Sequence, residues 1–224
     1  MKSRVLLTSL LMASTVSVVQ AADVLKSEKE KFSYAVGVQI GQDLKRNGMD
    51  IDADSVALAI EDMLAGNEPK LTMAEMQTLF ADYQKREAAK KELAGQENKA
   101  QGAKFLAENK NKEGVIELPS GLQYKVITAG SGKQPTVDDT VSVHYRGTLL
   151  NGTEFDSSYQ RGTPATFPVG GVIKGWTEAL QLMKEGAKWQ LFIPSELGYG
   201  ARGAGGDIGP HSVLTFDVEL LEIK

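Results

Sequence analysis

The 224-residue sequence contains no cysteine and only two histidines, His144 and His211. Without cysteine the chain can form no disulfide, thiolate zinc site, iron–sulfur cluster or cysteine nucleophile. Two histidines leave little from which to build a histidine-based metal centre. The formal charge of −4 argues against nucleic-acid binding, which needs a basic surface. The composition therefore excludes much familiar chemistry, yet 42% of the residues are apolar and suffice for a folded core.

The first 22 residues have the pattern of a secretory signal peptide. Lys2 and Arg4 form a short positive region, residues 5–19 are mostly apolar, and Val19-Gln20-Ala21 is a small-residue cleavage site. The apolar stretch is too short and too polar for a membrane span, and the alternative is a buried N-terminal helix. The pattern predicts an exported protein without a membrane span, periplasmic or secreted.

Composition changes near Gly114. The chain before it is rich in Ala, Lys, Glu, Gln and Met, whereas most glycines, six of the seven prolines and both tryptophans follow it. Helix followed by sheet is the expected order, which makes this an α+β protein. We predict a helical dimerisation domain over residues 23–71, a long connecting helix over 72–113 and a sheet domain over 114–224, after the signal peptide.

Three apolar stripes at helical spacing precede Gly114. Asn47-Gly48 and Gly66-Asn67 end the first two helices, and a capping box of Thr72 and Glu75 begins the third. Helix formers continue to about Lys110, but the second half is so polar that it predicts a solvated strut. The stripes consist of Phe32, Val36, Ile40 and Leu44; Val56, Ala59, Ile60, Met63 and Leu64; and Met76, Leu79, Phe80 and Tyr83.

These helices are too small to bury their own apolar faces. Gly37 and Gly41, four residues apart, allow another helix to approach closely, and the methionine-rich faces can adapt in packing. We therefore predict a homodimer formed through the N-terminal helices. The alternative is that the stripes pack onto the C-terminal domain of the same chain.

Period-2 alternation of apolar residues dominates the chain after Gly114. Asn151-Gly152 is a strong hairpin signal, and one helical segment, Trp176 to Lys184, is ended by Gly186. The pattern predicts an antiparallel sheet folded over one short helix. The inward positions are Leu122, Tyr124 and Val126; Val141, Val143 and Tyr145; Trp189, Leu191 and Ile193; and Leu214, Phe216, Val218 and Leu220.

The acidic residues near position 50 have the spacing of a calcium loop. Asp50, Asp52 and Asp54 alternate, and Glu61 follows at the twelfth position. However, Ser55 stands where that loop needs glycine, and the next residues belong to a helical stripe. Asp52 or Asp54 is better interpreted as a helix N-cap.

Two other motifs also have structural explanations. Gly198-x-Gly200-x-x-Gly203 has the dinucleotide spacing, but more glycines follow in place of the helix that must hold the pyrophosphate. Asn151-Gly152-Thr153 is a formal glycosylation sequon that the hairpin turn explains. His144 and His211 have no triad arranged around them, so we interpret both as structural.

Eight aromatic and aliphatic residues are dispersed through the sheet domain, and periodicity alone cannot distinguish a core from a pocket. Their local contexts form five segments, which are, in chain order, Tyr145-Arg146-Gly147, Phe155-Asp156-Ser157-Ser158, Val172-Ile173-Lys174-Gly175-Trp176, Tyr199-Gly200 and Phe216-Asp217-Val218-Glu219-Leu220-Leu221. Through these segments, residues 115–224 resemble the FK506-binding-protein (FKBP) family of peptidyl-prolyl isomerases.

The N-terminal region resembles the exported Mip-type (macrophage infectivity potentiator) branch, whose members dimerise through it. The resemblance implies an FKBP-like antiparallel sheet wrapped on a short helix. It also implies an isomerase that needs no cofactor or metal and acts on proline-containing unfolded or extended polypeptides. A holdase chaperone and a surface adhesion or host-interaction factor are the competing hypotheses, and the first can coexist with catalysis.

The resemblance also implies which residues form the site. Trp176 would lie at the pocket floor beneath the prolyl ring, within a dry aromatic wall. Catalytic roles fall to Tyr145, Phe155, Asp156, Trp176 and Tyr199. Substrate-binding roles fall to Arg161, Phe167, Val172, Ile173, Ile208 and Phe216.

Polar groups around this pocket have distinct implied roles. The Ile173 N–H and the Tyr199 hydroxyl would donate to substrate carbonyl groups. Asp156 would lie beside the reacting carbonyl, tied to Tyr145 and Arg161. Whether Asp156 acts electrostatically or organises the pocket is left open by the sequence.

Two positions depart from small members of the family. Ala165 stands where an aromatic residue is common, and Ala204-Gly205-Gly206-Asp207 replaces a bulkier loop tip. FK506- or rapamycin-type macrolides remain candidate ligands, but their affinity and the preference for the residue before proline are left open.

Overall fold

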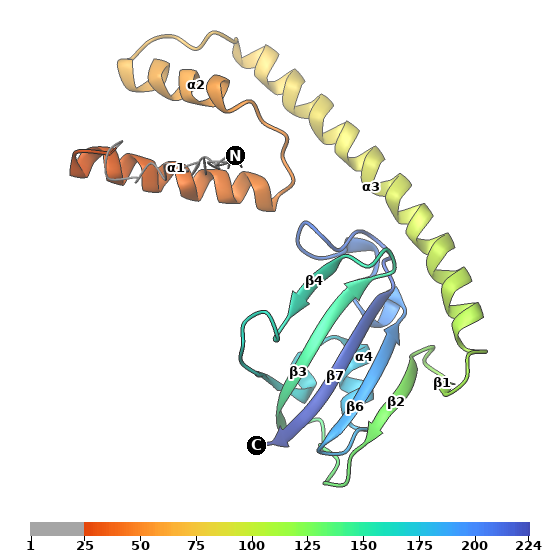
Figure 1. Ribbon diagram of the computed structural model, residues 1–224. Coiled ribbons are helices and arrows are strands. Elements are labelled where there is room, and N and C mark those ends of the chain that lie inside the picture. Colours follow the sequence, from red (N-terminus) through yellow and green to blue (C-terminus); the bar gives the residue numbers. More distant parts are fainter. Residues whose placement is uncertain (1–24) are drawn as a thin grey trace, which may run out of the picture. The chain divides into compact units, whose positions relative to one another are not determined.

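The computed structural model describes residues 25–224, so the predicted signal peptide lies outside the described residues. The chain divides into two units between Asp50 and Ile51. Helix α1 (Glu28–Arg46) belongs to the first unit; α2 (Ala53–Ala65), α3 (Met73–Asn109) and the sheet belong to the second (Figure 1). Within residues 25–224, no helix combines the length and apolarity needed to cross a bilayer.

The ends of the helices follow from their capping residues. Ser27 forms a capping box at the start of α1, and Thr72 forms the predicted box with Glu75 at the start of α3. Asp52 caps α2 by accepting a hydrogen bond from the Ser55 N–H at 2.9 Å, so this part of the calcium-like spacing has a structural role. Gly66, with φ of 74°, ends α2 in the left-handed conformation.

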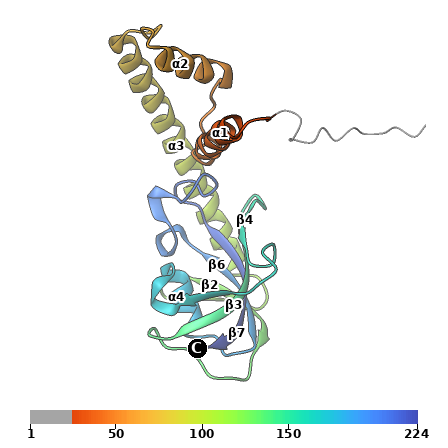
Figure 2. The same cartoon turned by 90° about the vertical axis from the view of Figure 1, so that its left-hand side faces the viewer.

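The second unit contains one antiparallel seven-stranded sheet of order β1-β2-β6-β7-β3-β4, with β5 also paired to β3. Helix α4 (Lys174–Leu180) lies against one face of this sheet (Figure 2). The predicted fold, helices followed by an antiparallel sheet wrapped on a short helix, is therefore confirmed. The strands are β1 (Val115–Glu117), β2 (Gln123–Ala129), β3 (Thr140–Leu149), β4 (Glu154–Ser157), β5 (Ala165–Pro168), β6 (Ala187–Ile193) and β7 (Leu214–Ile223).

The alternation rule holds for the central strands β6 and β7, whose predicted inward side chains are buried. It is wrong in β2, where Gln123 is fully buried and Val126 is exposed. The Gln123 amide donates to the Leu106 carbonyl at 2.9 Å and accepts from Asn109 at 3.0 Å, so its polar groups are satisfied. Val126 precedes a shift in the pairing register with β6, where strict alternation fails.

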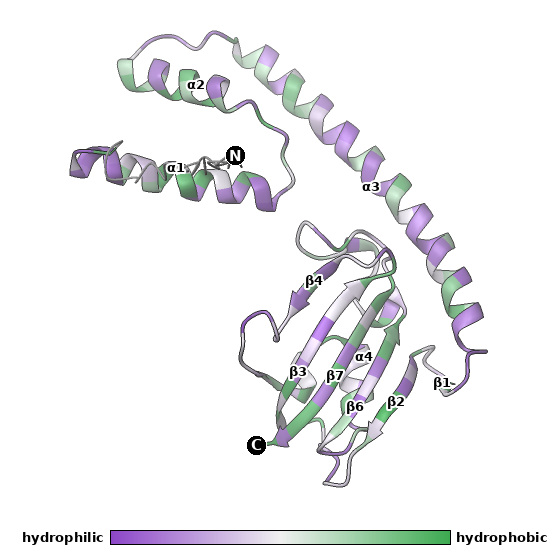
Figure 3. Ribbon diagram, in the orientation of Figure 1, coloured by the Kyte–Doolittle hydropathy of each residue, from purple (hydrophilic) through white to green (hydrophobic). Residues whose placement is uncertain are grey.

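The prediction of a wholly solvated second half for α3 is also wrong. Gly95, Gly102 and Asn109 are buried, and the Phe105 ring lies 5.8 Å from that of Phe192 in β6. Polar and apolar residues are mixed along this helix, so no wide apolar stripe marks its buried side (Figure 3). The three buried residues are two glycines and an amide, and a hydropathy pattern detects neither residue type.

The buried amide pair between α3 and β2 is expected to stabilise the fold. Replacing Asn109 with alanine leaves the Gln123 carbonyl oxygen without this donor, so the free energy of unfolding should fall by about 1–3 kcal/mol. Asn111→Ala is the matched control, because that amide donates only to the Ala107 carbonyl on the exposed helix end. Denaturant unfolding should separate the two variants, and equal stability would contradict this account.

Candidate active site

A cavity of about 680 Å³ opens between α4 and the sheet. All the predicted site residues except Arg161 line it, which brings together segments that are up to 71 residues apart in the chain. Gly171, Ala204, Gly205 and Asp207 complete the wall. The predicted lining residues are Tyr145, Phe155, Asp156, Phe167, Val172, Ile173, Trp176, Tyr199, Ile208 and Phe216.

Trp176 anchors the aromatic part of the cavity from α4. Its ring meets those of Tyr145 and Phe216 edge to face, with centroids 5.3 Å apart in both pairs, and that of Phe167 at 5.8 Å. Each such pair contributes about 0.5–1.5 kcal/mol beyond area burial. The side chain is only 4% exposed, so the same residue belongs to the core and to the cavity.

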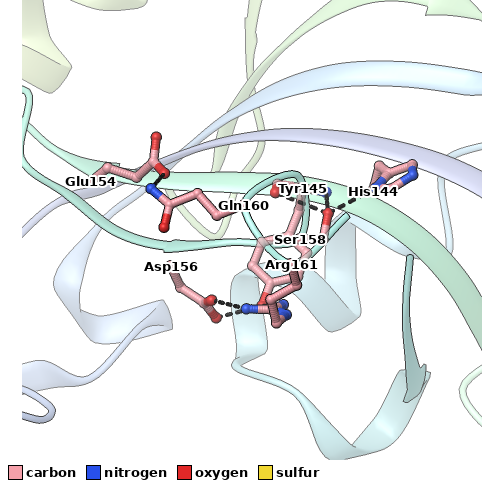
Figure 4. Close-up of polar contacts among 7 residues, drawn as sticks. All are labelled: His144, Tyr145, Glu154, Asp156, Ser158, Gln160 and Arg161. Atoms are coloured by element: carbon pink, nitrogen blue, oxygen red, sulfur yellow. Dashed lines mark hydrogen bonds and ion pairs between the residues drawn. The ribbon is translucent and has the colours of Figure 1, made fainter. Parts of the chain in front are cut away.

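A polar network joins Tyr145 of this aromatic set to Asp156 and Arg161 (Figure 4). The Tyr145 hydroxyl donates to Asp156, and Arg161 donates to the other carboxylate oxygen of Asp156 at 2.6 Å. Arg161 also donates to the Tyr145 hydroxyl oxygen at 2.9 Å. Arg161 therefore lies outside the lining but orients two residues that belong to it.

The loop from Tyr199 to Ile208 forms another wall. Ala204 and Ile208 exchange backbone hydrogen bonds of 2.9 and 3.1 Å, which closes the loop on itself. Gly203 has φ of 67°, and a Cβ there would lie 2.2 Å from the Ile208 carbonyl oxygen, so only glycine fits. Gly200 and Gly203 thus lie in a tight loop that contains the 3-10 turn η4 (Gly200–Arg202), and no α-helix follows the motif within residues 204–224, as the sequence suggested.

Comparison with known proteins gives the family. The profile of FKBP-type peptidyl-prolyl cis-trans isomerases matches residues 131–221, and that of the domain amino terminal to such isomerases matches residues 29–126. The chain is 44% identical to the outer membrane protein MIP of Legionella longbeachae over 98% of this chain and 97% of that protein. This chain belongs to the FKBP-type peptidyl-prolyl cis-trans isomerases.

Two other relatives lead to the same conclusion. The peptidyl-prolyl cis-trans isomerase Mip of Coxiella burnetii is 44% identical, covering 91% of this chain and 90% of that protein. The crystal structure of FkpA from Escherichia coli superposes with a TM-score of 0.62 at 38% identity, covering 89% of this chain and 98% of that one. The protein is thus an FKBP isomerase of the Mip and FkpA type; the five segments predicted the FKBP family, and the N-terminal region predicted the Mip-type branch.

The network sets the charge state of this FKBP site. Burial raises the pKa of Asp156, but hydrogen bonds from Tyr145 and Arg161 more than offset it and hold that pKa below its ordinary value. Burial and the bond to Asp156 raise the pKa of Tyr145. At neutral pH the cavity therefore presents a carboxylate held by a protonated phenol and a guanidinium.

Two residues that support the FKBP cavity were not assigned a role from the sequence. Ser158 is fully buried; its hydroxyl accepts from the Tyr145 N–H at 2.8 Å and lies 2.9 Å from His144 Nδ1. Gly147 lies under two cavity rings, since a Cβ there would be 2.6 Å from Phe155 and 2.7 Å from Phe216. Position inside a matched segment was the only available signal for either residue.

The remaining predicted positions are also placed. His144 stacks on Tyr159 with ring centroids 4.8 Å apart and lies outside the cavity lining. Ala165 pairs with Val143 in the sheet and packs against the core, also outside the lining. The Ile173 N–H, at the N-cap of α4, has no hydrogen-bond partner among residues 25–224. It is thus available as a donor at the cavity.

Proposed function

We propose that this isomerase catalyses rotation about X–Pro bonds in the aromatic cavity by binding the twisted amide more tightly than the planar one. The uncatalysed barrier is about 20 kcal/mol because the amide has partial double-bond character. A twisted amide loses that resonance and becomes less polar, so a dry apolar site favours it over water. The observation that carries this proposal is the cavity of aromatic rings around Trp176, with a carboxylate network beside it.

In this proposal the prolyl ring rests on Trp176. The Ile173 N–H and the Tyr199 hydroxyl donate to carbonyl groups of the bound chain and hold it across the cavity. Asp156 lies beside the reacting carbonyl, where its negative charge disfavours the polar, planar amide more than the twisted one. Rotation then needs no covalent intermediate, which suits a chain without cysteine.

Removing the Tyr199 hydroxyl tests the role of one donor. Tyr199→Phe should lower kcat/KM about two- to tenfold, because a single neutral hydrogen bond contributes about 0.5–1.5 kcal/mol. The control is Tyr159→Phe, which removes a hydroxyl that faces Glu219 outside the cavity. Isomerisation of a proline-containing peptide is measured for both, and equal rates would contradict the role of Tyr199.

The pH profile tests the charge of Asp156. The pKa of this carboxyl is lower in the folded protein than the value of about 3.9 expected in the unfolded chain. At any pH above that unfolded value the carboxyl is therefore ionised and contributes fully to stability. The charge and this contribution are lost as pH falls through the folded pKa. We expect kcat/KM to stay level from about pH 8 to pH 5 and to fall only below about pH 4. A midpoint near pH 6–7 would instead implicate a histidine.

We further propose that the N-terminal helices form a homodimer. Helix α1 has no buried side chain. On α2 the side chain of Leu64 is 85% exposed, and on α3 that of Phe80 is 66% exposed. Such exposed apolar faces are typical of interaction surfaces. The double variant Leu64→Glu and Phe80→Glu should sediment as a monomer, whereas Gln84→Glu, at an exposed polar position of α3, should remain a dimer. Dimeric behaviour of the double variant would contradict this interface.

Export supplies the proposed setting. The predicted signal peptide would deliver the enzyme to the periplasm or beyond, where proline-containing unfolded chains are its clients, and one relative carries the name outer membrane protein. Cell fractionation combined with protease accessibility of intact cells tests this location. Accessory holdase activity remains a second proposal, supported by the exposed apolar helices. It requires the protein to suppress aggregation of a proline-free client.

A further inference from the structure

The second half of α3 contacts the chain segment that directly follows the active-site loop. That loop, residues 199–208, supplies Tyr199 and Ile208 to the cavity. Residues 209–213 then lead from the loop into β7. The contact therefore lies directly next to one wall of the cavity in the chain, at residues that do not themselves line it.

Asn98 makes the polar part of the contact. Its side-chain amide donates to the Pro210 carbonyl at 2.9 Å and to the Ser212 hydroxyl oxygen at 3.3 Å. The Ser212 hydroxyl in turn donates to the Gly209 carbonyl at 2.9 Å. One side chain of α3 thereby holds Pro210 and Ser212 directly, and Gly209 through Ser212, just after Ile208.

Two glycines of α3 make the apolar part. A Cβ at Gly95 would lie 3.2 Å from Pro210, and one at Gly102 would lie 2.7 Å from the Val213 side chain. Both glycines are buried within a helix, where glycine costs about 1 kcal/mol relative to alanine. Close approach of α3 to residues 210–213 accounts for glycine at both positions.

The held segment is also tied to the beginning of the loop. The His211 N–H donates to the Gly200 carbonyl at 2.9 Å, which joins the two ends of the loop. His211 has φ of 55°, a left-handed conformation that costs a non-glycine residue about 1–2 kcal/mol. Such a conformation persists where the surroundings over-determine it. Here the surroundings are α3 on one side and the loop on the other.

We propose that Asn98 is a positioning residue of the isomerase, which holds residues 209–212 and thereby sets the place of Tyr199 and Ile208 at the cavity. The inference rests on the proposed role of that cavity. It means that the working catalytic unit includes the second half of α3 as well as the sheet domain. Loss of the contact lets the loop move away, so substrate affinity falls while the Trp176 floor and the Asp156 network are unchanged.

The test compares full-length variants of two buried contacts that α3 makes. Asn98→Ala and Asn98→Asp each remove the amide donor beside the loop, whereas Asn109→Ala removes an amide pair with Gln123 of β2, and neither partner of that pair lines the cavity. We expect both Asn98 variants to raise KM for a proline-containing peptide about three- to tenfold with kcat changed less than twofold. Asn109→Ala should leave both constants within twofold, at a temperature where circular dichroism shows all variants folded.

A readout independent of activity accompanies the kinetics. The backbone amide NMR signals of Tyr199, Ala204 and Ile208 should shift in the Asn98 variants and stay in place in Asn109→Ala. Ser212→Ala, which removes the second partner, should shift the same signals and serves if the Asn98 variants do not fold. Unchanged loop signals, or an equal rise in KM in Asn109→Ala, would overturn the positioning role. If the wild type proves inactive while the loop signals still shift in the Asn98 variants, the result counts against the proposed function and leaves the positioning role supported.

Discussion

Replacing Trp176 with alanine is expected to abolish measurable isomerase activity and to lower the free energy of unfolding by about 3–5 kcal/mol. The substitution removes the ring against which Tyr145, Phe167 and Phe216 pack edge to face. It also opens the cavity floor to water, so the site loses the dry surface that favours a twisted amide. Thermal or denaturant unfolding and peptide isomerisation together measure both effects.

A second tryptophan supplies the matched control. Trp189 of β6 is 6% exposed and stacks on Tyr124 with ring centroids 4.2 Å apart, but it does not line the cavity. Trp189→Ala should therefore cost similar stability while the folded fraction keeps nearly full activity. If both variants lose activity in proportion to stability alone, Trp176 has no role beyond the core.

Replacing Asp156 with alanine should lower kcat/KM about 10- to 100-fold, because hydrogen bonds to a charged group contribute about 1.5–3 kcal/mol. The variant leaves the Tyr145 hydroxyl and the Arg161 guanidinium without their shared acceptor. Half of the Arg161 side chain is exposed, so solvent screens the pair and the fold should lose only about 1 kcal/mol or less. A large kinetic loss with a small stability loss is the signature of a site residue.

Arg161→Lys refines that result. Lysine keeps the positive charge but cannot donate in a fork to both Asp156 and the Tyr145 hydroxyl. An activity between those of the wild type and Asp156→Ala would assign Arg161 to orientation of the pair. Activity equal to the wild type would mean that charge alone suffices.

Much of the fold could be predicted because local chemistry determined it. The capping box at Thr72, the left-handed Gly66 and the Asn151-Gly152 hairpin each depend on residues within a few positions of one another. The alternation in β6 and β7 follows from one buried face. These signals are contained in short windows of sequence, so no tertiary information was needed.

The site was predicted by other means. Periodicity could not separate a core from a cavity, and Trp176 proves to belong to both. Only the order of five short segments indicated a site, through resemblance to a family. The roles of the individual residues remain predictions that the variants above test.

The features that sequence could not supply involve polar or small residues brought together from distant segments. Gln123 was not among the expected inward positions, because hydropathy cannot reveal its partner Asn109, which lies in another element. The buried side of α3 was missed for the same reason, since glycines and amides carry no apolar signal. The need for glycine at position 147 becomes clear only in the structure, where the rings of Phe155 and Phe216 occupy the space that a Cβ would fill.

The scarcity of histidine and the lack of cysteine fit this mechanism. A catalyst that only prefers a twisted amide needs apolar rings, a few donors and one oriented carboxylate. Each of these groups occurs in the cavity on residue types that the composition supplies. The central claim is therefore that catalysis resides in this cavity and depends on its dry floor and its carboxylate.

The most direct test is NMR exchange spectroscopy on a peptide with a single X–Pro bond, with and without substoichiometric protein. We predict that the wild type and Trp189→Ala bring cis–trans exchange from the range of tens of seconds into one fast enough for cross-peaks to appear. Trp176→Ala, where it is folded, should leave exchange close to the uncatalysed rate, and Asp156→Ala should accelerate exchange about 10- to 100-fold less than the wild type does. A wild-type protein no faster than buffer, or Asp156 and Trp176 variants as fast as the wild type, would contradict the account.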